Sequence, residues 1–379
     1  MVKVKINTEN VKLAIEASSL KKEYIAKRMN KSVKVIEKWI SGQEKEMTFS
    51  EAVKLGEVLG VNPNIFFLNK PYQDLEMPAD FRLKKGAEKL GIKSIKNIRN
   101  IIYLQETLYD IMSNLNINTS TKIETANLNS DPSVLASKYR EILGIEDLIK
   151  KKMKDEDFFE EIRSILFDMN IIVIIDNFPD ENVKGLSLSS DKISMIVINS
   201  SDTNTKSRIF TLFHEFAHLL LKNNILCDAS EGLIDENTNG NIYEIERWCN
   251  KFSANILIPP EIIKKEFKGT VDNEKIKRIA GRISSKYHVS KSTIYYALLD
   301  NHIIDRTQLN DLLPGVNEKK EKGGRGLPLE KRRIKMYGKD VSKLIFYAHD
   351  EKVITTRDVL SIFSIKLDDL SRVRNYAIK

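Results

Sequence analysis

The feature that most constrains this chain is a pair of histidines four residues apart with a glutamate directly after the first, His214-Glu215-x-x-His218. Apolar residues at positions 209, 212, 213, 216 and 220 recur at helical spacing and predict an amphipathic helix through the motif. Residues four apart on a helix share a face, so both imidazoles can reach one metal ion. The glutamate between them then lies beside that ion and can accept a proton from water.

The alternative is that both histidines are core residues with satisfied hydrogen bonds. The chain has only five histidines, however, and two of them stand at ligand spacing around a glutamate. This favours a metal site, which requires a third protein ligand because a catalytic zinc ion keeps one position for water.

A second helical pattern, at residues 243–258, offers that ligand before a Pro-Pro pair ends it. Glu246 and Asn250 lie one turn apart on a face beside its apolar stripe, so both can point to the same place. Glu244 is the competing ligand. We prefer Glu246 because metal ligands must converge on one point.

The spacing Glu246-x-x-x-Asn250 resembles that of gluzincin proteases, in which an aspartate takes the second position. The resemblance implies that Asn250 accepts a hydrogen bond from the non-ligating nitrogen of His214. Such a bond would fix the tautomer of the imidazole.

Residues 171–260 further resemble the ImmA/IrrE family of metallo-endopeptidases. The matching features are a strand at 171–175, a turn containing Gly185, a strand at 193–199, the sequence Phe210 to His218, and the sequence Glu246 to Pro259. Cys249 and Ser253 stand where the family usually has alanine, and both replacements are small for small.

This resemblance implies one catalytic Zn²⁺ ion, with Mn²⁺ or Fe²⁺ as alternatives at such nitrogen and oxygen donors. The implied ligands are His214, His218 and Glu246. Glu215 would be the general base that takes a proton from water and passes it to the leaving amine.

Substrate alignment and oxyanion stabilisation are less constrained by the sequence. In gluzincins an edge strand aligns the substrate backbone by strand addition, and we expect the strand at 193–199 to do so here. His288 and Tyr243 are candidates for the oxyanion stabiliser, although each also fits an ordinary structural role.

The N-terminal segment carries several short helical patterns separated by tight turns. The expected helices cover residues 11–17, 23–29, 33–40 and 50–59. Ser32 is expected to cap the third helix, and Ser41-Gly42 to end it. Short helices with a compact apolar set indicate a helix-turn-helix arrangement. The segment resembles XRE/Cro-type repressor domains, which implies that residues 32–38 form the recognition helix.

Charge also links this segment to nucleic acid. Residues 1–70 contain 13 lysines and arginines against 8 acidic residues, an excess that phosphate contacts favour. The expected DNA-contacting residues are Lys31, Ser32, Lys34 and Lys38. Lysines suit phosphates better than base edges, so the alternative is a helical protein-binding module without DNA contact. Such domains commonly read palindromes as dimers, which predicts a homodimer or another partner chain.

Composition describes globular material in more than one domain. The 379 residues are too many for one ordinary core, and 41% are hydrophobic while 30% are charged. The net charge of +8 is compatible with a polyanionic partner. Two cysteines predict no disulfide framework. No apolar run is long enough to span a bilayer and no secretory signal is recognisable, so we expect a cytoplasmic protein without membrane contact.

The expected fold is α+β and mostly helical, with a gluzincin-like protease domain built around a small sheet. The expected divisions are a helix-turn-helix domain at 1–70, a linker at 71–94, the metallopeptidase domain at 95–314, a Gly/Lys linker at 315–328 and a helical C-terminal subdomain at 329–379. Further helices are expected at 95–116, 133–143, 155–169, 276–287, 289–299, 331–347 and 356–363.

These features together predict a zinc-dependent, site-specific endopeptidase. The family resemblance implies that its substrate is a transcriptional repressor, often of the XRE type, and the N-terminal domain would bind DNA or that repressor. The main alternative is a DNA-binding regulator or antitoxin whose metallopeptidase fold acts as a sensor or interaction module. A different zinc hydrolase is a second alternative. Retention of all four site residues favours catalysis.

Overall fold

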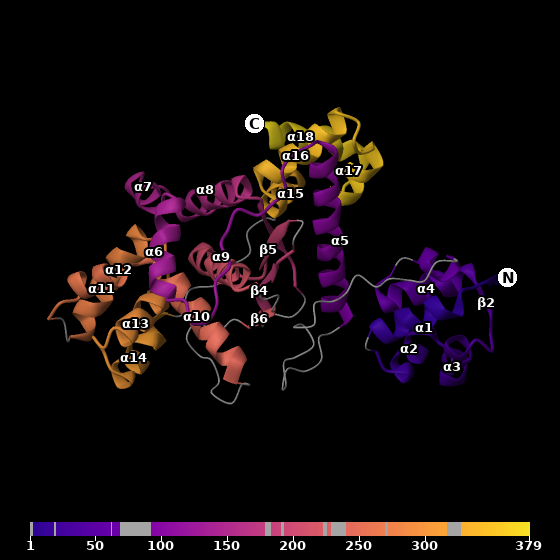
Figure 1. Cartoon of the computed structure of the whole chain (residues 1–379), viewed down its shortest axis with the longest axis horizontal. Coiled ribbons are helices and arrows are strands. Elements are labelled where there is room, and N and C mark those ends of the chain that lie inside the picture. The colour runs from indigo at the N-terminus through magenta and orange to yellow at the C-terminus, as the bar shows by residue number, and fades with distance from the viewer. Residues whose placement is uncertain are drawn as a thin grey trace. The chain divides into compact units, whose positions relative to one another are not determined.

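The chain forms two compact units, which we describe separately (Figure 1). The computed structural model describes residues 3–18, 20–61, 63–68, 92–178, 183–190, 193–222, 226–228, 240–269, 272–316 and 327–379. One unit comprises Met1–Glu106 with Phe178–Asp180, and the other comprises Thr107–Asn177 with Glu181–Lys379. Most of both predicted linkers lies outside the described residues.

The first unit combines short helices with a two-stranded antiparallel ribbon that the sequence analysis did not predict. Its elements are β1 (Lys3–Lys5), α1 (Thr8–Ala17), α2 (Lys22–Met29), α3 (Val33–Ser41), β2 (Glu46–Thr48), α4 (Phe49–Leu59) and the 3₁₀ helix η1 (Pro63–Phe67). All four helices expected here are therefore confirmed, with ends that differ by up to three residues.

Local signals set the ends of these helices. Asn30, in the left-handed conformation, ends α2, and Gly42 with φ 74° ends α3 as predicted. Thr48 and Glu51 form a capping box that starts α4. Ser32 occupies the N-cap position of α3, but its side chain makes no capping hydrogen bond. The core beneath these helices includes Val11, Ile25, Ile36, Trp39, Leu55 and Phe66.

The second unit surrounds a small sheet with helices, which confirms the expected mostly helical α+β class. Its elements up to the sheet are α6 (Pro132–Ile142), α7 (Ile145–Lys150), α8 (Asp155–Asp168), β3 (Ile171–Asp176), β4 (Val183–Leu188) and β5 (Ser194–Asn199). Next come α9 (Thr205–Leu220), β6 (Leu226–Asp228), α10 (Gly240–Leu257), α11 (Pro260–Glu266), α12 (Asn273–Lys286), α13 (Lys291–Asp300), α14 (Arg306–Leu312) and η3 (Leu313–Val316). The long helix α5 (Ile92–Asn114) precedes them.

The sheet has the strand order β3-β5-β4-β6. β3 runs parallel to β5, with Ile171 opposite Ser194, while β4 is antiparallel to both β5 and β6. Every residue of β5 is buried, as expected for an inner strand with an almost continuous apolar sequence.

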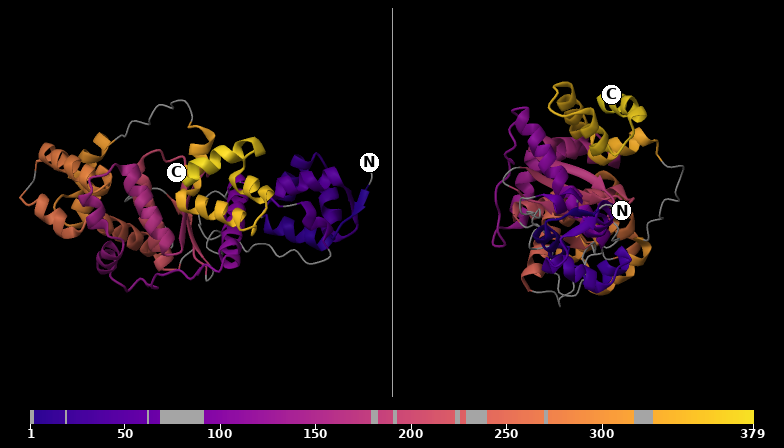
Figure 2. Two further views of the ribbon diagram at one scale, coloured as in Figure 1. Left: turned by 90° about the horizontal axis from the view of Figure 1, so that it is seen from above. Right: turned by 90° about the vertical axis from the view of Figure 1, so that its right-hand side faces the viewer.

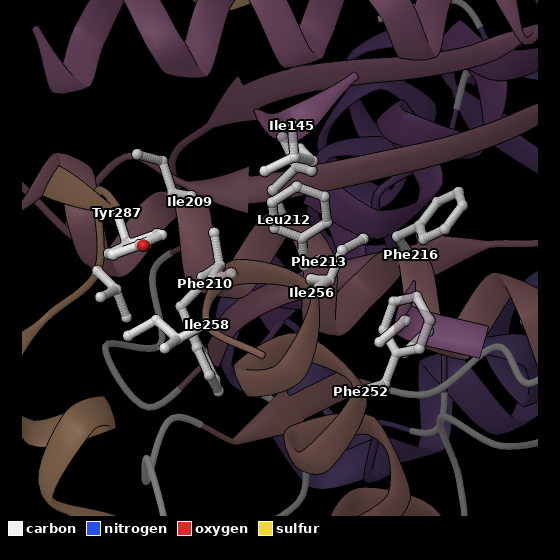
Figure 3. Close-up of a cluster of buried hydrophobic side chains, with 14 of the residues drawn as sticks. Ile145, Ile209, Phe210, Leu212, Phe213, Phe216, Phe252, Ile256, Ile258 and Tyr287 are labelled. Atoms are coloured by element: carbon white, nitrogen blue, oxygen red, sulfur yellow. The ribbon is translucent and has the colours of Figure 1, made fainter. Parts of the chain in front are cut away.

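Helix α9 lies along this sheet and packs against α10 on its other side (Figure 1). Figure 3 shows the apolar cluster that forms there: Leu212, Phe213 and Phe216 of α9 lie near Phe252 and Ile256 of α10. This packing fixes both helices in one rigid core, so side chains that α9 and α10 direct at one another are held in place.

A bundle of four α-helices and one short 3₁₀ helix ends the chain and lies in the same unit (Figure 2). It consists of α15 (Leu329–Tyr337), α16 (Lys339–Asp350), α17 (Thr356–Phe363), η4 (Leu367–Asp369) and α18 (Leu370–Ile378). The single helix predicted at 331–347 is wrong, because Gly338 with φ 81° separates α15 from α16. Buried Arg163 of α8 joins the bundle to the unit by donating to the carbonyl oxygens of Lys335 and Met336.

Three backbone features of this bundle recur fifty positions earlier, in α12 to α14. His288 and Gly338, fifty positions apart, both have positive φ at the turn into the second helix of each set. His302 and Lys352, again fifty apart, are left-handed at the next turn. α14 and α17 also begin fifty positions apart.

Candidate metal centre

Helix α9 carries the histidine motif through the interior of the second unit. The Asn204 side chain accepts hydrogen bonds from the backbone N–H groups of Lys206 and Ser207 and so caps the helix. All side chains from Arg208 to Leu220 are buried. The motif therefore lies between the sheet and α10, and its polar groups are largely removed from bulk water.

His214 and His218 lie one helical turn apart and direct the same ring atom at one place. Their Nε2 atoms are 3.2 Å from one another. The His218 side chain is fully buried and His214 is 6% exposed. Two nitrogens converging in this way is the arrangement that a shared metal ion requires.

Glu246 of α10 completes the cluster from the opposite side. Its Oε2 atom lies 3.1 Å from Nε2 of His214, and its Oε1 atom lies 3.9 Å from Nε2 of His218. The three ligand atoms that these residues offer lie within 4.8 Å of one another. Two imidazoles and one carboxylate are the donor set of His₂Glu zinc hydrolases, so the residues present fit such an ion.

The competing ligand Glu244 lies elsewhere. It is exposed on α10, whereas Glu246 is 9% exposed. Two residues along a helix correspond to more than half a turn, so the two carboxylates point in different directions. The structure therefore brings Glu246, and not Glu244, to the histidines.

Glu215 is fully buried and lies between α9 and the sheet. Its carboxylate packs against Gly185 of β4 so closely that a Cβ atom at position 185 would be 2.5 Å from Oε1. The expected turn around Gly185 is wrong, because this residue lies within a strand. A lone glycine between Lys184 and Leu186 in a strand is a general signal of a close backbone approach, but it does not identify Glu215 as the neighbour.

Asn250 lies one turn after Glu246, as predicted, and its side chain hydrogen-bonds to His214. Burial lowers the pKa of His214, but the hydrogen bond and negative charge of Glu246 outweigh it. The charge of Glu215 and the bond to Asn250 raise this pKa further, so it lies above its ordinary value. The two carboxylates thus give the surroundings of His214 a negative electrostatic potential, which favours binding of a divalent cation.

The two candidates for oxyanion stabilisation are placed differently. Nδ1 of His288 lies 2.7 Å from Oδ1 of Asp155, and its ring stacks on Phe158. His288 therefore joins the turn after α12 to the start of α8, which is a structural role. Tyr243 lies half-buried in the second turn of α10.

In the first unit, the four predicted DNA-contacting residues differ in exposure and in their contacts with other side chains. Ser32, Lys34 and Lys38 are exposed on α3 and its N-terminus. Nζ of Lys31 lies 2.6 Å from Oε1 of Glu51, so this lysine is engaged with α4. Burial raises the pKa of Glu51, but hydrogen bonds from Lys31 and Thr48 outweigh it and lower that pKa to about 2.

The predicted strand addition at residues 193–199 is wrong. β5 lies inside the sheet, and β3 and β4 occupy both of its edges. Among the described strands of this sheet, β3 and β6 are the outer ones. Helix α15 packs against β3, and Arg163 donates to the Val173 carbonyl oxygen of that strand. Among the described residues, β6 is therefore the better candidate for strand addition.

Comparison with known proteins agrees with this geometry. Residues 168–299 match the family model of the IrrE N-terminal-like domain, a peptidase family designated Peptidase_M78. The matched range begins at the last residue of α8, ends within α13 and contains the cluster of His214, His218 and Glu246. No curated protein matches the chain. In the part of the chain that the structure describes, no helix is both long and apolar enough to cross a membrane.

Proposed function

We propose that this chain is a metal-dependent endopeptidase in which His214, His218 and Glu246 hold one Zn²⁺ ion. The observation that carries this proposal is the convergence of three ligand atoms within 4.8 Å of one another, next to a second buried carboxylate, that of Glu215. The match of residues 168–299 to a peptidase family supports the same reaction class.

When bound, such an ion polarises a peptide carbonyl and lowers the pKa of water toward neutrality. Glu215 is the general base: a carboxylate oxygen accepts a proton from the attacking water and then donates it to the leaving amine nitrogen. The interior position of Glu215 removes competing hydrogen bonds from bulk water, which strengthens its electrostatic action. Asn250 holds the His214 ring in the orientation and tautomer that ligation needs.

The substrate in this proposal is a protein segment in an extended conformation, aligned along β6, an outer strand among the described strands of the sheet. We propose a transcriptional repressor of the XRE type as that protein. The support for this choice is the succession of short helices α1 to α4, with a tight turn at the left-handed Asn30 between α2 and α3. This succession is compatible with a helix-turn-helix domain that would recognise an operator or a related repressor.

The test compares wild-type protein with a Glu215→Gln variant, each co-expressed with repressors from neighbouring genes and analysed by intact mass. Wild-type protein is expected to shorten one repressor at a single bond, and Glu215→Gln is expected to leave it whole. Glu244→Gln is the matched control, because it makes the same chemical change at an exposed position and should cleave normally. Equal processing by Glu215→Gln would remove the assigned base from the mechanism.

A DNA-binding regulator with a metal-sensing domain is the second candidate. Ser32, Lys34 and Lys38 favour it, because they are exposed together on the helix that follows the α2–α3 turn. Gel shifts on the gene's own upstream DNA at several salt concentrations test this function. Salt-sensitive, sequence-selective binding without cleavage of any repressor would favour the regulator. Absence of binding at low salt would instead indicate a protein partner.

A further inference from the structure

Gly185 occupies the point where the sheet comes closest to the proposed general base. It lies in β4 opposite Ile198 of β5 and Cys227 of β6, at an irregularity in the β4–β6 pairing. Helix α9 packs against β4 from one face. Any side chain on Gly185 would therefore extend from the strand toward α9.

The space that such a side chain would need is already filled by Glu215. A Cβ atom at position 185 would lie 2.5 Å from Oε1, 2.8 Å from Cγ and 2.9 Å from Cδ of Glu215. All three nearest atoms thus belong to one side chain, and they include Cγ in its middle as well as the carboxyl carbon Cδ. Relief would require the whole side chain to move, not only its terminal oxygen.

Glu215 has little room for such a movement. Its side chain is fully buried, and its neighbours on α9, Phe216 and Leu219, are buried too. In a close-packed interior the displaced carboxylate would have to enter space that other atoms occupy.

Backbone conformation does not explain the glycine. Gly185 is absent from the residues with positive φ, so alanine can adopt its conformation without strain. In that case a Gly→Ala change should stabilise the chain by reducing the freedom of the unfolded state. Space for the Glu215 carboxylate is therefore the physical reason for a glycine here.

We propose that Gly185 is a positioning residue: it lets the Glu215 carboxylate lie against β4 and thereby sets where that carboxylate stands relative to His214, His218 and Glu246. The inference rests on the proposed function for the role of Glu215 as a base. It adds that the backbone of β4 contacts the carboxylate of Glu215, and that one methyl group added at position 185 displaces this carboxylate.

The first arm of the test measures thermal unfolding of the full, metal-loaded chain and does not depend on activity. Gly185→Ala is expected to lower the unfolding midpoint by about 5 °C in the wild-type background. In a Glu215→Ala background the same change should be neutral or stabilising, because the clashing side chain is gone. Gly281→Ala is the matched control, since the nearest atom to a Cβ there, Cε of Lys291, is 3.8 Å away.

The outcomes of this arm are decisive even if the single variant misfolds. Recovery of a folded chain in the Gly185→Ala, Glu215→Ala double variant supports the inference. An equal cost of Gly185→Ala in both backgrounds, or a double variant that also fails to fold, overturns it, because Glu215 would then not be what Gly185 accommodates.

The second arm measures cleavage of the identified repressor together with bound metal. Gly185→Ala is expected to lower kcat about 100-fold while KM and metal content stay unchanged, since a displacement of about 1 Å suffices for such a loss. Unchanged kcat in Gly185→Ala, with active wild-type and Gly281→Ala proteins, overturns the positioning role alone. An inactive wild-type protein overturns the proposed function, and the positioning role falls with it.

Discussion

Replacing Asn250 with alanine is expected to weaken metal binding without disturbing the fold. In the proposed site Asn250 hydrogen-bonds to His214 and orients its ring, and that ring supplies one of the three proposed ligand atoms. Loss of such an outer partner typically costs about 10- to 100-fold in metal affinity. This corresponds to about 1.4–2.7 kcal/mol of binding free energy.

The assay is competition for Zn²⁺ between the purified chain and a chromogenic chelator at fixed pH. Asn255→Ala is the matched control, because Asn255 lies on the same helix and donates to Oγ of Ser133, outside the ligand cluster. The expected result is a weakened dissociation constant for Asn250→Ala and an unchanged one for Asn255→Ala. Equal affinities for the two variants would refute the reasoning that Asn250 supports His214.

A third variant, Asn250→Asp, tests whether the side-chain oxygen of Asn250 is the atom that supports His214. A carboxylate accepts a stronger hydrogen bond from an imidazole than an amide does, and it makes the ligating nitrogen more basic. We therefore expect affinity equal to or above that of the wild type. A loss as large as that of the alanine variant would show that the amide N–H₂ group, and not its oxygen, is what the site uses.

Three other predictions concern stability and DNA. Arg163→Met should lower the free energy of unfolding by about 3 kcal/mol in urea denaturation. The reason is that the carbonyl oxygens of Val173, Lys335 and Met336 lose a charged donor. A cost below about 1 kcal/mol would contradict this anchoring role. Glu51→Gln should cost about 1 kcal/mol above pH 4.5. Because folding lowers the pKa of Glu51 to about 2, the greater stability of the wild type over Glu51→Gln should disappear as pH falls from 4.5 toward 2. A stability difference that grows on acidification would contradict the ion pair between Glu51 and Lys31. Replacing both Lys34 and Lys38 with alanine should reduce the slope of log affinity for DNA against log salt by about 2 in gel shifts, and an unchanged slope would exclude phosphate contacts by these lysines.

The parts of the fold that the sequence predicted well are those governed by local periodicity. The α9 stripe, the α10 helix ended by prolines, and helices α1 to α4 follow from side-chain spacing and from caps such as Gly42. The approach of Glu246 to His214 was also predictable, because the helical periodicity of residues 243–258 places Glu246 on the face beside the apolar stripe.

The errors arise where long-range pairing decides the outcome. A buried apolar strand has the same sequence signature whether it lies inside a sheet or at its edge, so β5 was mistaken for an edge strand. The break at Gly338 was missed because a single glycine in a helical pattern is often tolerated. Here the close approach of Arg163 to Gly338 and the positive φ require it.

Gly185 was misplaced for a related reason. Glycine is the residue type expected in turns, and only the three-dimensional contact with Glu215 shows that this one is needed for space. The proposed base and the glycine are thirty positions apart, so neither spacing nor composition could connect them.

Metal content measured on purified, loaded chain tests the central claim most directly. Elemental analysis after gel filtration is expected to find one zinc ion per chain in the wild type and in Glu215→Gln, which keeps all three ligands. The His218→Ala and Glu246→Ala variants are expected to retain almost none. A wild-type chain that retains no ion, or variants that retain as much as the wild type, would contradict a site built from His214, His218 and Glu246.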